Sequence, residues 1–120
     1  MIMAIGAHPD DIEFGCGGTL YKHKQQGDKI VMVIMTNTQS VNGVTGENLR
    51  TKEELQNESE CSAKILGCDL EFLPFTDLHV PFNFESVSKL EKVMIDYNVD
   101  TIYTHWGGDT NQDHIATLKT

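Results

Sequence analysis

The stretch Lys29-Ile-Val-Met-Val-Ile-Met35 places six apolar residues in succession and predicts a buried strand. A continuous apolar run, rather than an alternating one, is typical of a parallel sheet that helices cover on both faces. Shorter runs rich in apolar or β-branched residues predict three further strands, at Ile2–Ile5, Leu70–Leu73 and Thr101–Thr104. These runs favour an α/β fold over an all-helical or all-β one.

Segments with apolar residues at helical spacing separate these strands. The predicted helices cover the following ranges: Leu20–Gln26, closed by Gly27; Thr51–Leu66, closed by Gly67; Phe84–Tyr97; and a last helix that begins at Asp113. The range Thr36–Asn48 is rich in Thr, Asn, Ser and Gly and predicts a long loop. Because strands and helices alternate, the sequence predicts a single domain over residues 1–120, with a mainly parallel sheet in a three-layer α/β/α arrangement.

The composition argues against several kinds of partner. The 120 residues include 18 acidic and 9 basic side chains, a formal net charge of −9, and the basic ones are scattered. Phosphate backbones repel such a chain, so we expect no nucleic acid as partner. No apolar run approaches the roughly 20 residues of a membrane span. No signal peptide is evident, and Cys16, Cys61 and Cys68 form no C-x-x-C motif, so we expect free thiols and a cytoplasmic location.

Two groups of polar side chains stand directly after the first and the last predicted strands. Ala7-His8-Pro9-Asp10-Asp11 follows the first strand, and His105 to His114, reading HWGGDTNQDH, follows the last. Ligands of open α/β sheets bind at the carboxyl ends of the strands, where the strand order reverses. If the two strands are central neighbours, the two groups face each other across this crevice.

Two imidazoles and one carboxylate in these groups are suited to a metal ion. His8, Asp11 and His114 would leave one position open on a tetrahedral Zn²⁺, as catalytic zinc sites do. The same donors also suit Fe²⁺. Zinc lowers the pKa of bound water to about 7 and polarises a carbonyl oxygen. We therefore expect zinc as the cofactor, with iron as the alternative.

A hydrolytic role needs further groups near the metal. Asp10 stands beside Asp11 and fits a general base, and the amide of Asn111 fits a donor to a developing oxyanion. Asp113 fits a group that orients a neighbouring side chain or ligand. A plainer alternative is that Asp11 caps the following helix and that the second group consists of loop residues and a helix cap. The presence of matching groups at two strand ends favours the metal site.

Other residues that carry chemistry show weaker patterns. Gly15-Cys16-Gly17-Gly18 lacks the G-x-G-x-x-G spacing of dinucleotide-binding folds, and nearby acidic residues would repel a pyrophosphate. We expect these glycines to let a helix pack closely on the sheet. His23 is interpreted as a solvated helix residue, His79 as a loop residue, and Trp106 as a pocket wall or packing residue.

The two motifs together resemble those of the PIG-L/LmbE-like N-deacetylases. The resemblance is carried by Gly6–Thr19 and Asp109–His114, and it is supported by Lys64–Gly67. It implies a Rossmann-like α/β fold and the zinc-dependent removal of acetyl groups from N-acetylated amino sugars. It also implies these roles: His8, Asp11 and His114 as metal ligands, and Asp10 as the base.

The chain departs from the family pattern in three respects. Some members carry a His at the position of Asn111, and an Asn can donate a hydrogen bond but cannot take a proton. Many carry an Arg where Leu55 stands, so Arg50 is the nearest substitute for substrate binding, with Asp109 as a second candidate. Members are commonly longer, with strands after the second motif, so the domain is expected to be truncated at its C-terminus. An exposed sheet edge would then favour a homo-oligomer.

The site residues and the resemblance together imply a zinc-dependent hydrolase that removes the acetyl group from an N-acetylated amino sugar or its glycoconjugate. Two alternatives stay open: a truncated metal-binding remnant without catalysis, and an amidohydrolase that acts on another N-acyl group. Bound zinc without hydrolysis would indicate the first alternative. Activity on other N-acyl glucosamines would indicate the second.

Overall fold

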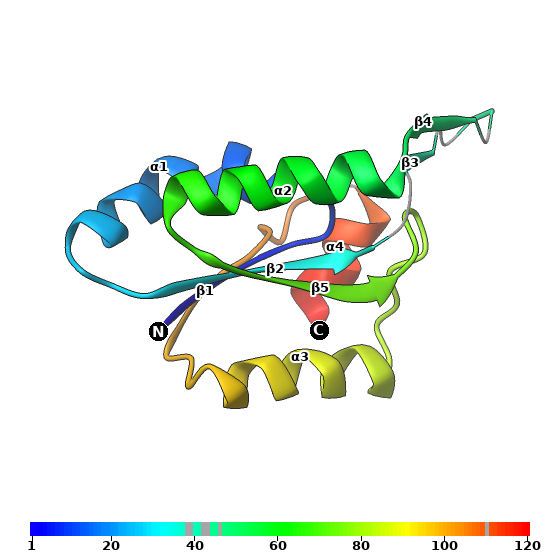
Figure 1. Cartoon of the computed structure of the whole chain (residues 1–120). Helices are drawn as coiled ribbons and strands as arrows, with labels where there is room; N and C mark the ends of the chain where they lie inside the picture. Colours follow the sequence, from blue (N-terminus) through cyan, green and yellow to red (C-terminus); the bar gives the residue numbers. More distant parts are fainter. Residues whose placement is uncertain (38–39, 42–43, 46, 110) are drawn as a thin grey trace.

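A four-stranded parallel sheet forms the centre of the protein, with helices on both of its faces (Figure 1). The computed structural model describes residues 1–37, 40–41, 44–45, 47–109 and 111–120. The strands run in the order β5-β2-β1-β6, with these bounds: β1 Ile2–Gly6, β2 Ile30–Thr36, β5 Asp69–Phe75 and β6 Thr101–Tyr103. The helices have these bounds: α1 Asp11–Gln25, α2 Lys52–Leu66, α3 Phe84–Asp96 and α4 Gln112–Lys119. The predicted α/β/α fold with a parallel sheet is confirmed.

The apolar sequence of β2 follows from its position between two hydrophobic cores. Every residue of β2 is buried. Successive side chains of a strand point to opposite faces, so one strand supplies both cores. They divide as follows: Val31, Val33 and Met35 toward α3 and α4, and Ile30, Met32 and Ile34 toward α1 and α2. The continuous apolar run is therefore explained by a sheet that is covered on both faces.

The strand order reverses beside β1, and this reversal locates the site. β1 pairs with β2 on one side and with β6 on the other. The chain moves outward from β1 to β2 and β5, and α3 then returns it to β6 on the far side of β1. The carboxyl ends of β1 and β6 thus border the crevice at which open α/β sheets bind ligands. The expected neighbourhood of these strands is confirmed, although β6 lies at the sheet edge rather than at its centre.

Local sequence sets the ends of α2 and α3, which lie close to their predicted bounds. The side chain of Thr51 accepts a hydrogen bond from the N–H of Glu54 and caps α2. Gly67 ends that helix with φ 70°, a left-handed conformation that glycine adopts without strain. Asn83 and Ser86 form a reciprocal capping box at the start of α3.

The first helix is longer than predicted, and it is kinked. It begins at Asp11 rather than Leu20, and Cys16 within it has a non-helical φ of −145°. Glycine has a low helix propensity, so Gly15-Cys16-Gly17-Gly18 concealed the helix in the sequence. The expectation that these glycines allow close packing on the sheet is wrong, because a Cβ atom at any of them would meet nothing within 4 Å. Buried Ile12 and Leu20 dock the helix instead.

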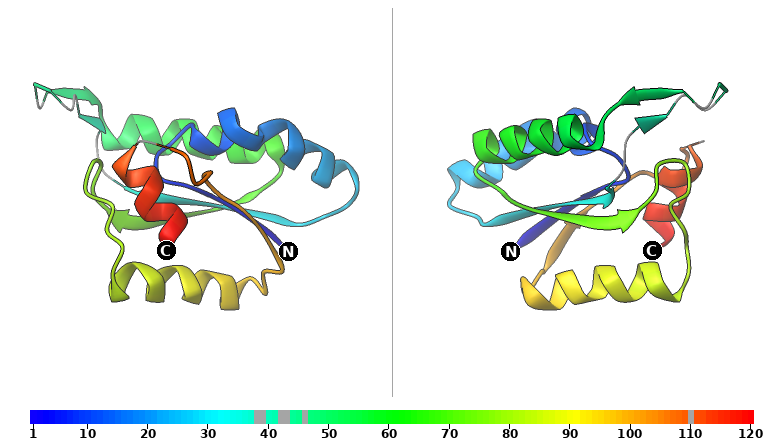
Figure 2. Two further views of the ribbon diagram at one scale, coloured as in Figure 1. Left: turned by 180° about the vertical axis from the view of Figure 1, so that it is seen from behind. Right: turned by 45° about the vertical axis from the view of Figure 1, so that its right-hand side comes forward.

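A short antiparallel ribbon replaces part of the predicted long loop. Strand β3, Ser40–Val41, pairs with β4, Asn48–Arg50. Figure 2 shows that this ribbon projects from the body of the protein beyond the N-terminal end of α2. The loop predicted over Thr36–Asn48 is therefore wrong at these strands, and residues 38, 39, 42, 43 and 46 lie outside the described part of the chain. The ribbon is formed by backbone pairing between β3 and β4. The sequence therefore contains no apolar pattern that would predict it.

Two expectations from composition can be compared with the structure. Cys16, Cys61 and Cys68 are all free, as predicted. Within the described ranges, none of the helices combines the length and the apolar character that crossing a membrane requires.

Replacing Ile34 by Ala is expected to lower the free energy of unfolding by about 2–5 kcal/mol, because this fully buried side chain would leave a cavity. Ile65 is 81% exposed, so Ile65→Ala should change the same quantity by less than about 0.5 kcal/mol. Urea unfolding followed by circular dichroism measures both variants. Equal effects would contradict the placement of β2 between two cores.

Candidate metal centre

The three predicted metal ligands come together at the carboxyl ends of β1 and β6. His8 follows β1, Asp11 begins α1, and His114 lies in the first turn of α4. Asp11 Oδ2 lies 3.4 Å from His8 Nδ1 and 3.0 Å from His114 Nε2. Each residue offers one donor atom, and the three donor atoms lie within 4.8 Å of one another. The fold thus brings the two sequence motifs into one cluster.

A tight turn after β1 sets the direction of Asp11. Asp10 has a left-handed backbone with φ 84°, a conformation that Asp tolerates better than most residues. Asp11 Oδ2 accepts a hydrogen bond from the N–H of His8 at 2.9 Å. Asp10 occupies the cap position of α1, but its side chain makes no capping hydrogen bond. The interpretation of Asp11 as the helix cap is therefore wrong, because Asp11 belongs to the first turn and faces His8.

The second motif forms a hydrogen-bonded network at the start of α4. Asn111 caps this helix, because its Oδ1 accepts from the N–H groups of Asp113 and His114 at 2.9 and 3.2 Å. Asp109 Oδ1 accepts from the N–H of Asn111 at 2.9 Å, and Asp109 Oδ2 lies 2.8 Å from His114 Nδ1. An ionised carboxylate only accepts hydrogen bonds, so His114 Nδ1 donates and its Nε2 is left facing Asp11. The helix-cap interpretation holds for Asn111 and is compatible with a place in the site.

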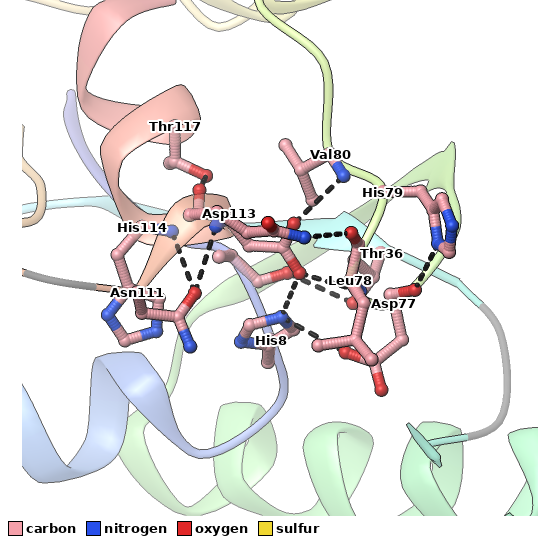
Figure 3. A network of polar contacts seen from close by, with 12 residues as sticks. His8, Thr36, Asp77, Leu78, His79, Val80, Asn111, Asp113, His114 and Thr117 are labelled. Carbon is pink, nitrogen blue, oxygen red and sulfur yellow. Dashed lines mark hydrogen bonds and ion pairs between the residues drawn. The ribbon is translucent and has the colours of Figure 1, made fainter. Parts of the chain in front are cut away.

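Asp113 is a buried carboxylate that contacts Nε2 of His8, the ring nitrogen that does not face Asp11 (Figure 3). Its Oδ2 lies 2.6 Å from His8 Nε2 and accepts from the N–H of Leu78 at 2.7 Å. Its Oδ1 accepts from the N–H of Val80 at 2.9 Å. Because Nε2 is turned to Asp113, the Nδ1 atom of His8 is turned to Asp11. A carboxylate that holds the second nitrogen is typical of imidazoles that bind metals.

Charge in this network is shared between one imidazole and two carboxylates. Burial by itself lowers the pKa of His8, but the hydrogen bonds to Asp11 and Asp113 outweigh it and raise the pKa to about 10. Burial by itself raises the pKa of either carboxyl group, and the contacts with His8 bring both pKa values below the ordinary value. In the metal-free protein at neutral pH, His8 is therefore an imidazolium ion between two carboxylates.

Sequence reasoning gave no role to His105, which lies against the ligands. Its ring stacks on that of His114, with centroids 3.9 Å apart and planes inclined by 12°. Its Nε2 accepts from the N–H of Ala7 at 3.1 Å. Burial, followed by the neighbouring His114, lowers the pKa of His105, which favours the neutral ring that an accepting Nε2 requires. The position of His105 directly after β6 is the feature of the sequence that could have indicated a place in the site.

Asp77 is the second residue that sequence reasoning missed. Its Oδ1 lies 3.1 Å from His8 Nε2. It comes from the loop after β5, a strand at the far edge of the sheet from β6. The loop reaches the site because the N–H groups of Leu78 and Val80 bind Asp113. No local pattern indicates this long-range contact.

A cavity of about 410 Å³ opens beside the cluster. Asp11 and His105 line it together with residues of α1 and β6. Trp106, which is 72% exposed, forms part of its wall, as predicted. The volume falls in the range of small-molecule sites.

The remaining candidates are placed outside this cluster or are only partly described. Arg50 ends β4, and its side chain lies outside the described part of the chain. His79 is an exposed loop residue, as predicted. The expectation of a solvated His23 is wrong, because its Nδ1 lies 2.9 Å from Asp28 Oδ2 and its Nε2 lies 2.8 Å from the hydroxyl of Tyr103. These partners come from a turn and from β6, which a helical pattern does not reveal.

The fold and the cluster together define a family. Residues 3–120 match the PIG-L family, described as GlcNAc-PI de-N-acetylase, and the chain belongs to this family. Among curated proteins it is similar to the uncharacterized deacetylase YaiS of Escherichia coli (strain K12). The two are 37% identical over 126 residues, which cover 98% of this chain and 64% of YaiS. The predicted resemblance is confirmed.

Two solved structures are similar over nearly the whole chain. One is the conserved protein TT1542 from Thermus thermophilus, with 28% identity and a TM-score of 0.82 over 98% of this chain and 51% of that protein. The other is the N,N'-diacetylchitobiose deacetylase from Pyrococcus horikoshii, with 26% identity and a TM-score of 0.82 over 97% and 45%. The chain spans about half the length of these solved proteins.

The stability of the metal-free protein should fall as His8 loses its proton. The pKa of His8 is raised from 6.5 to about 10 on folding, so the stability that its charged form contributes is complete below pH 6.5 and is lost as the pH rises toward 10. Scanning calorimetry in the presence of a chelator should show the unfolding temperature falling over this interval. The decrease in unfolding temperature should be smaller in His8→Gln, and in His23→Gln it should be as large as in the wild type. Parallel profiles for wild type and His8→Gln would contradict this assignment.

Proposed function

We propose that the cluster binds Zn²⁺ through His8 Nδ1, Asp11 Oδ2 and His114 Nε2. The observation that carries the proposal is that each imidazole turns one nitrogen toward Asp11 while a carboxylate holds its other nitrogen. Two donors at about 2.0–2.1 Å from a tetrahedral zinc ion lie about 3.3 Å apart. Asp11 Oδ2 is 3.4 and 3.0 Å from the two nitrogens, so both the donor types and the spacing fit zinc. Fe²⁺ is the alternative for the same donors.

The proposed reaction is the hydrolysis of the acetyl amide of an N-acetylated amino sugar or its glycoconjugate. Membership of the PIG-L family supports deacetylase chemistry, and the structurally similar Pyrococcus enzyme is named as the deacetylase of such a sugar. When bound, zinc supplies a Lewis acid for the amide carbonyl and lowers the pKa of water. Because the chain spans only part of its relatives' length, the proposal concerns the chemistry of the site within this chain.

Asp10 is proposed as the general base. It is exposed, it adjoins Asp11 in sequence, and its side chain is not used as a helix cap. Its carboxylate takes a proton from the water that attacks the amide carbon. When the carbon–nitrogen bond breaks, the same carboxyl group returns the proton to the amine, and acetate leaves. One residue thus serves both proton transfers.

Asn111 is proposed as a donor to the oxyanion that forms during the attack. Its Oδ1 is committed to the start of α4, and Figure 3 shows its amide nitrogen on the side of His8. A fixed N–H donor stabilises developing negative charge without reorganising. For Asp109 we now favour orientation of His114 over substrate binding, because its two oxygens engage Asn111 and His114. Arg50 stays a proposed substrate contact.

The two alternatives to this function can be separated by assay. A metal-binding remnant would hold zinc but hydrolyse none of a panel of N-acetyl amino sugars. An amidohydrolase for another acyl group would act on N-propionyl or longer N-acyl glucosamines and not on the acetyl compound. A cytoplasmic location and self-association through an exposed sheet edge are further proposals that neither assay addresses.

Zinc content is the first test of the site. We expect about one zinc ion per chain after reconstitution, because three donors converge on one position. His8→Ala should lose the metal, whereas His23→Ala removes an imidazole elsewhere and should retain it. Elemental analysis of the desalted proteins measures the content. Absence of zinc from the reconstituted wild type would reject the proposed centre.

The role of Asp10 is tested by Asp10→Asn, which keeps the shape of the side chain and removes the base. Turnover of an N-acetyl amino sugar should fall by about 10²–10⁴-fold, the usual contribution of a general base. Zinc content should stay at the wild-type level, because Asp10 is not among the three donors. Asp100→Asn is the matched control, because the side chain of Asp100 is 75% exposed and lies near the N-terminal amine. This variant should show the turnover rate of the wild type. Undiminished turnover in Asp10→Asn would exclude this residue as the base.

A further inference from the structure

The loop between β5 and α3 brings a second carboxylate to His8. Asp77 Oδ1 lies 3.1 Å from His8 Nε2, the nitrogen that Asp113 Oδ2 contacts at 2.6 Å. Both carboxylates are shielded from solvent, since the side chains of Asp77 and Asp113 are 12% and 1% exposed. The reaction proposed above gives Asp77 no part. Its position therefore needs an explanation of its own.

The backbone beside Asp77 is strained. Leu78 has φ 66°, a left-handed conformation that is unfavourable for a residue with a side chain. This conformation turns the N–H of Leu78 to Asp113 Oδ2, while the preceding side chain, that of Asp77, faces His8. The carbonyl of Leu78 also accepts from the side chain of Gln112 in α4. Strain that neighbouring contacts maintain is commonly found at functional sites.

Stabilisation of Asp113 does not account for Asp77. The N–H groups of Leu78 and Val80 already satisfy Asp113, and backbone N–H groups require no aspartate at position 77. A second carboxylate beside the first adds repulsion between like charges. The repulsion is offset if the imidazole between the two carboxylates is positively charged. It is also offset if the imidazole donates its N–H to both carboxylates while its other nitrogen binds a cation. The group that benefits from Asp77 is therefore His8.

We propose that Asp77 is a positioning residue for His8. With Asp113 it holds Nε2 from two directions, which sets the plane of the ring so that Nδ1 faces Asp11 Oδ2. Two carboxylates on one N–H also make the ring a more basic ligand. The orientation of His8 can be observed without metal, whereas the consequence for affinity rests on the proposed zinc centre.

The test compares Asp77→Asn with Asp96→Asn. The first substitution keeps the size of the side chain at His8 and removes its charge. The second removes a charge from the exposed end of α3, where Asp96 pairs with Lys92. Competition with a chromophoric chelator at fixed pH should show zinc binding about 10–100-fold weaker in Asp77→Asn, the usual effect of losing a partner of a metal ligand. Asp96→Asn should bind zinc as the wild type does.

The strained turn supplies an independent pair of variants. Glycine adopts φ 66° without strain, so Leu78→Gly should leave zinc affinity within about twofold of wild type. Valine is β-branched and is disfavoured in this conformation, so Leu78→Val should weaken zinc binding in the same direction as Asp77→Asn. If both Leu78 variants bind zinc equally, the left-handed turn does not position Asp77.

A spectroscopic measurement on the metal-free protein separates this inference from the proposed function. The side-chain ¹⁵N and ¹H resonances of His8 should shift at Nε2 in Asp77→Asn and not in Asp96→Asn, while the amide spectra show that all the proteins are folded. If wild type and Asp77→Asn bind zinc equally and their His8 resonances coincide, the role of Asp77 is overturned and the zinc centre stands. If the wild type binds no zinc, the zinc centre fails, and the His8 resonances alone decide whether Asp77 positions the ring.

Discussion

The buried carboxylate of Asp113 joins segments that are far apart in the sequence. It belongs to α4, it accepts from two N–H groups in the loop after β5, and it contacts His8 after β1. Leaving a buried charge without its partner costs about 3–5 kcal/mol. The loop, the last helix and the turn after β1 therefore adopt their positions together. The packing of this end of the sheet and the geometry of the candidate metal centre depend on the same hydrogen bonds.

The parallel sheet provides a frame on which these hydrogen bonds can form. β1 lies between β2 and β6, and both hydrophobic cores draw on its side chains. The N–H of Ala7 donates to His105, so the ends of β1 and β6 are also joined through the site itself. A rigid strand pair places donor atoms more reproducibly than a loop does. This explains why both predicted motifs follow strands that pair directly.

Most residues of the candidate site could be identified from the sequence, but the hydrogen bonds among them could not. His8, Asp11 and His114 could be selected because imidazole and carboxylate side chains follow two of the predicted strands directly. Asp77 could not be selected, because its strand lies at the opposite edge of the sheet and only the returning loop carries it to His8. The start of α1 was also misplaced, since glycines with low helix propensity occupy its first turns.

The sequence by itself determined the four strands of the central sheet, most of the helices, their alternation and the types of donor atom at two strand ends. These properties follow from hydrophobic periodicity and from residue chemistry, which are local. Only the tertiary structure decided which nitrogen of each imidazole faces Asp11, because that choice depends on carboxylates from other elements, Asp113 for His8 and Asp109 for His114. Tertiary packing determines which groups far apart in the chain form hydrogen bonds, and the periodicity of the sequence does not reveal them.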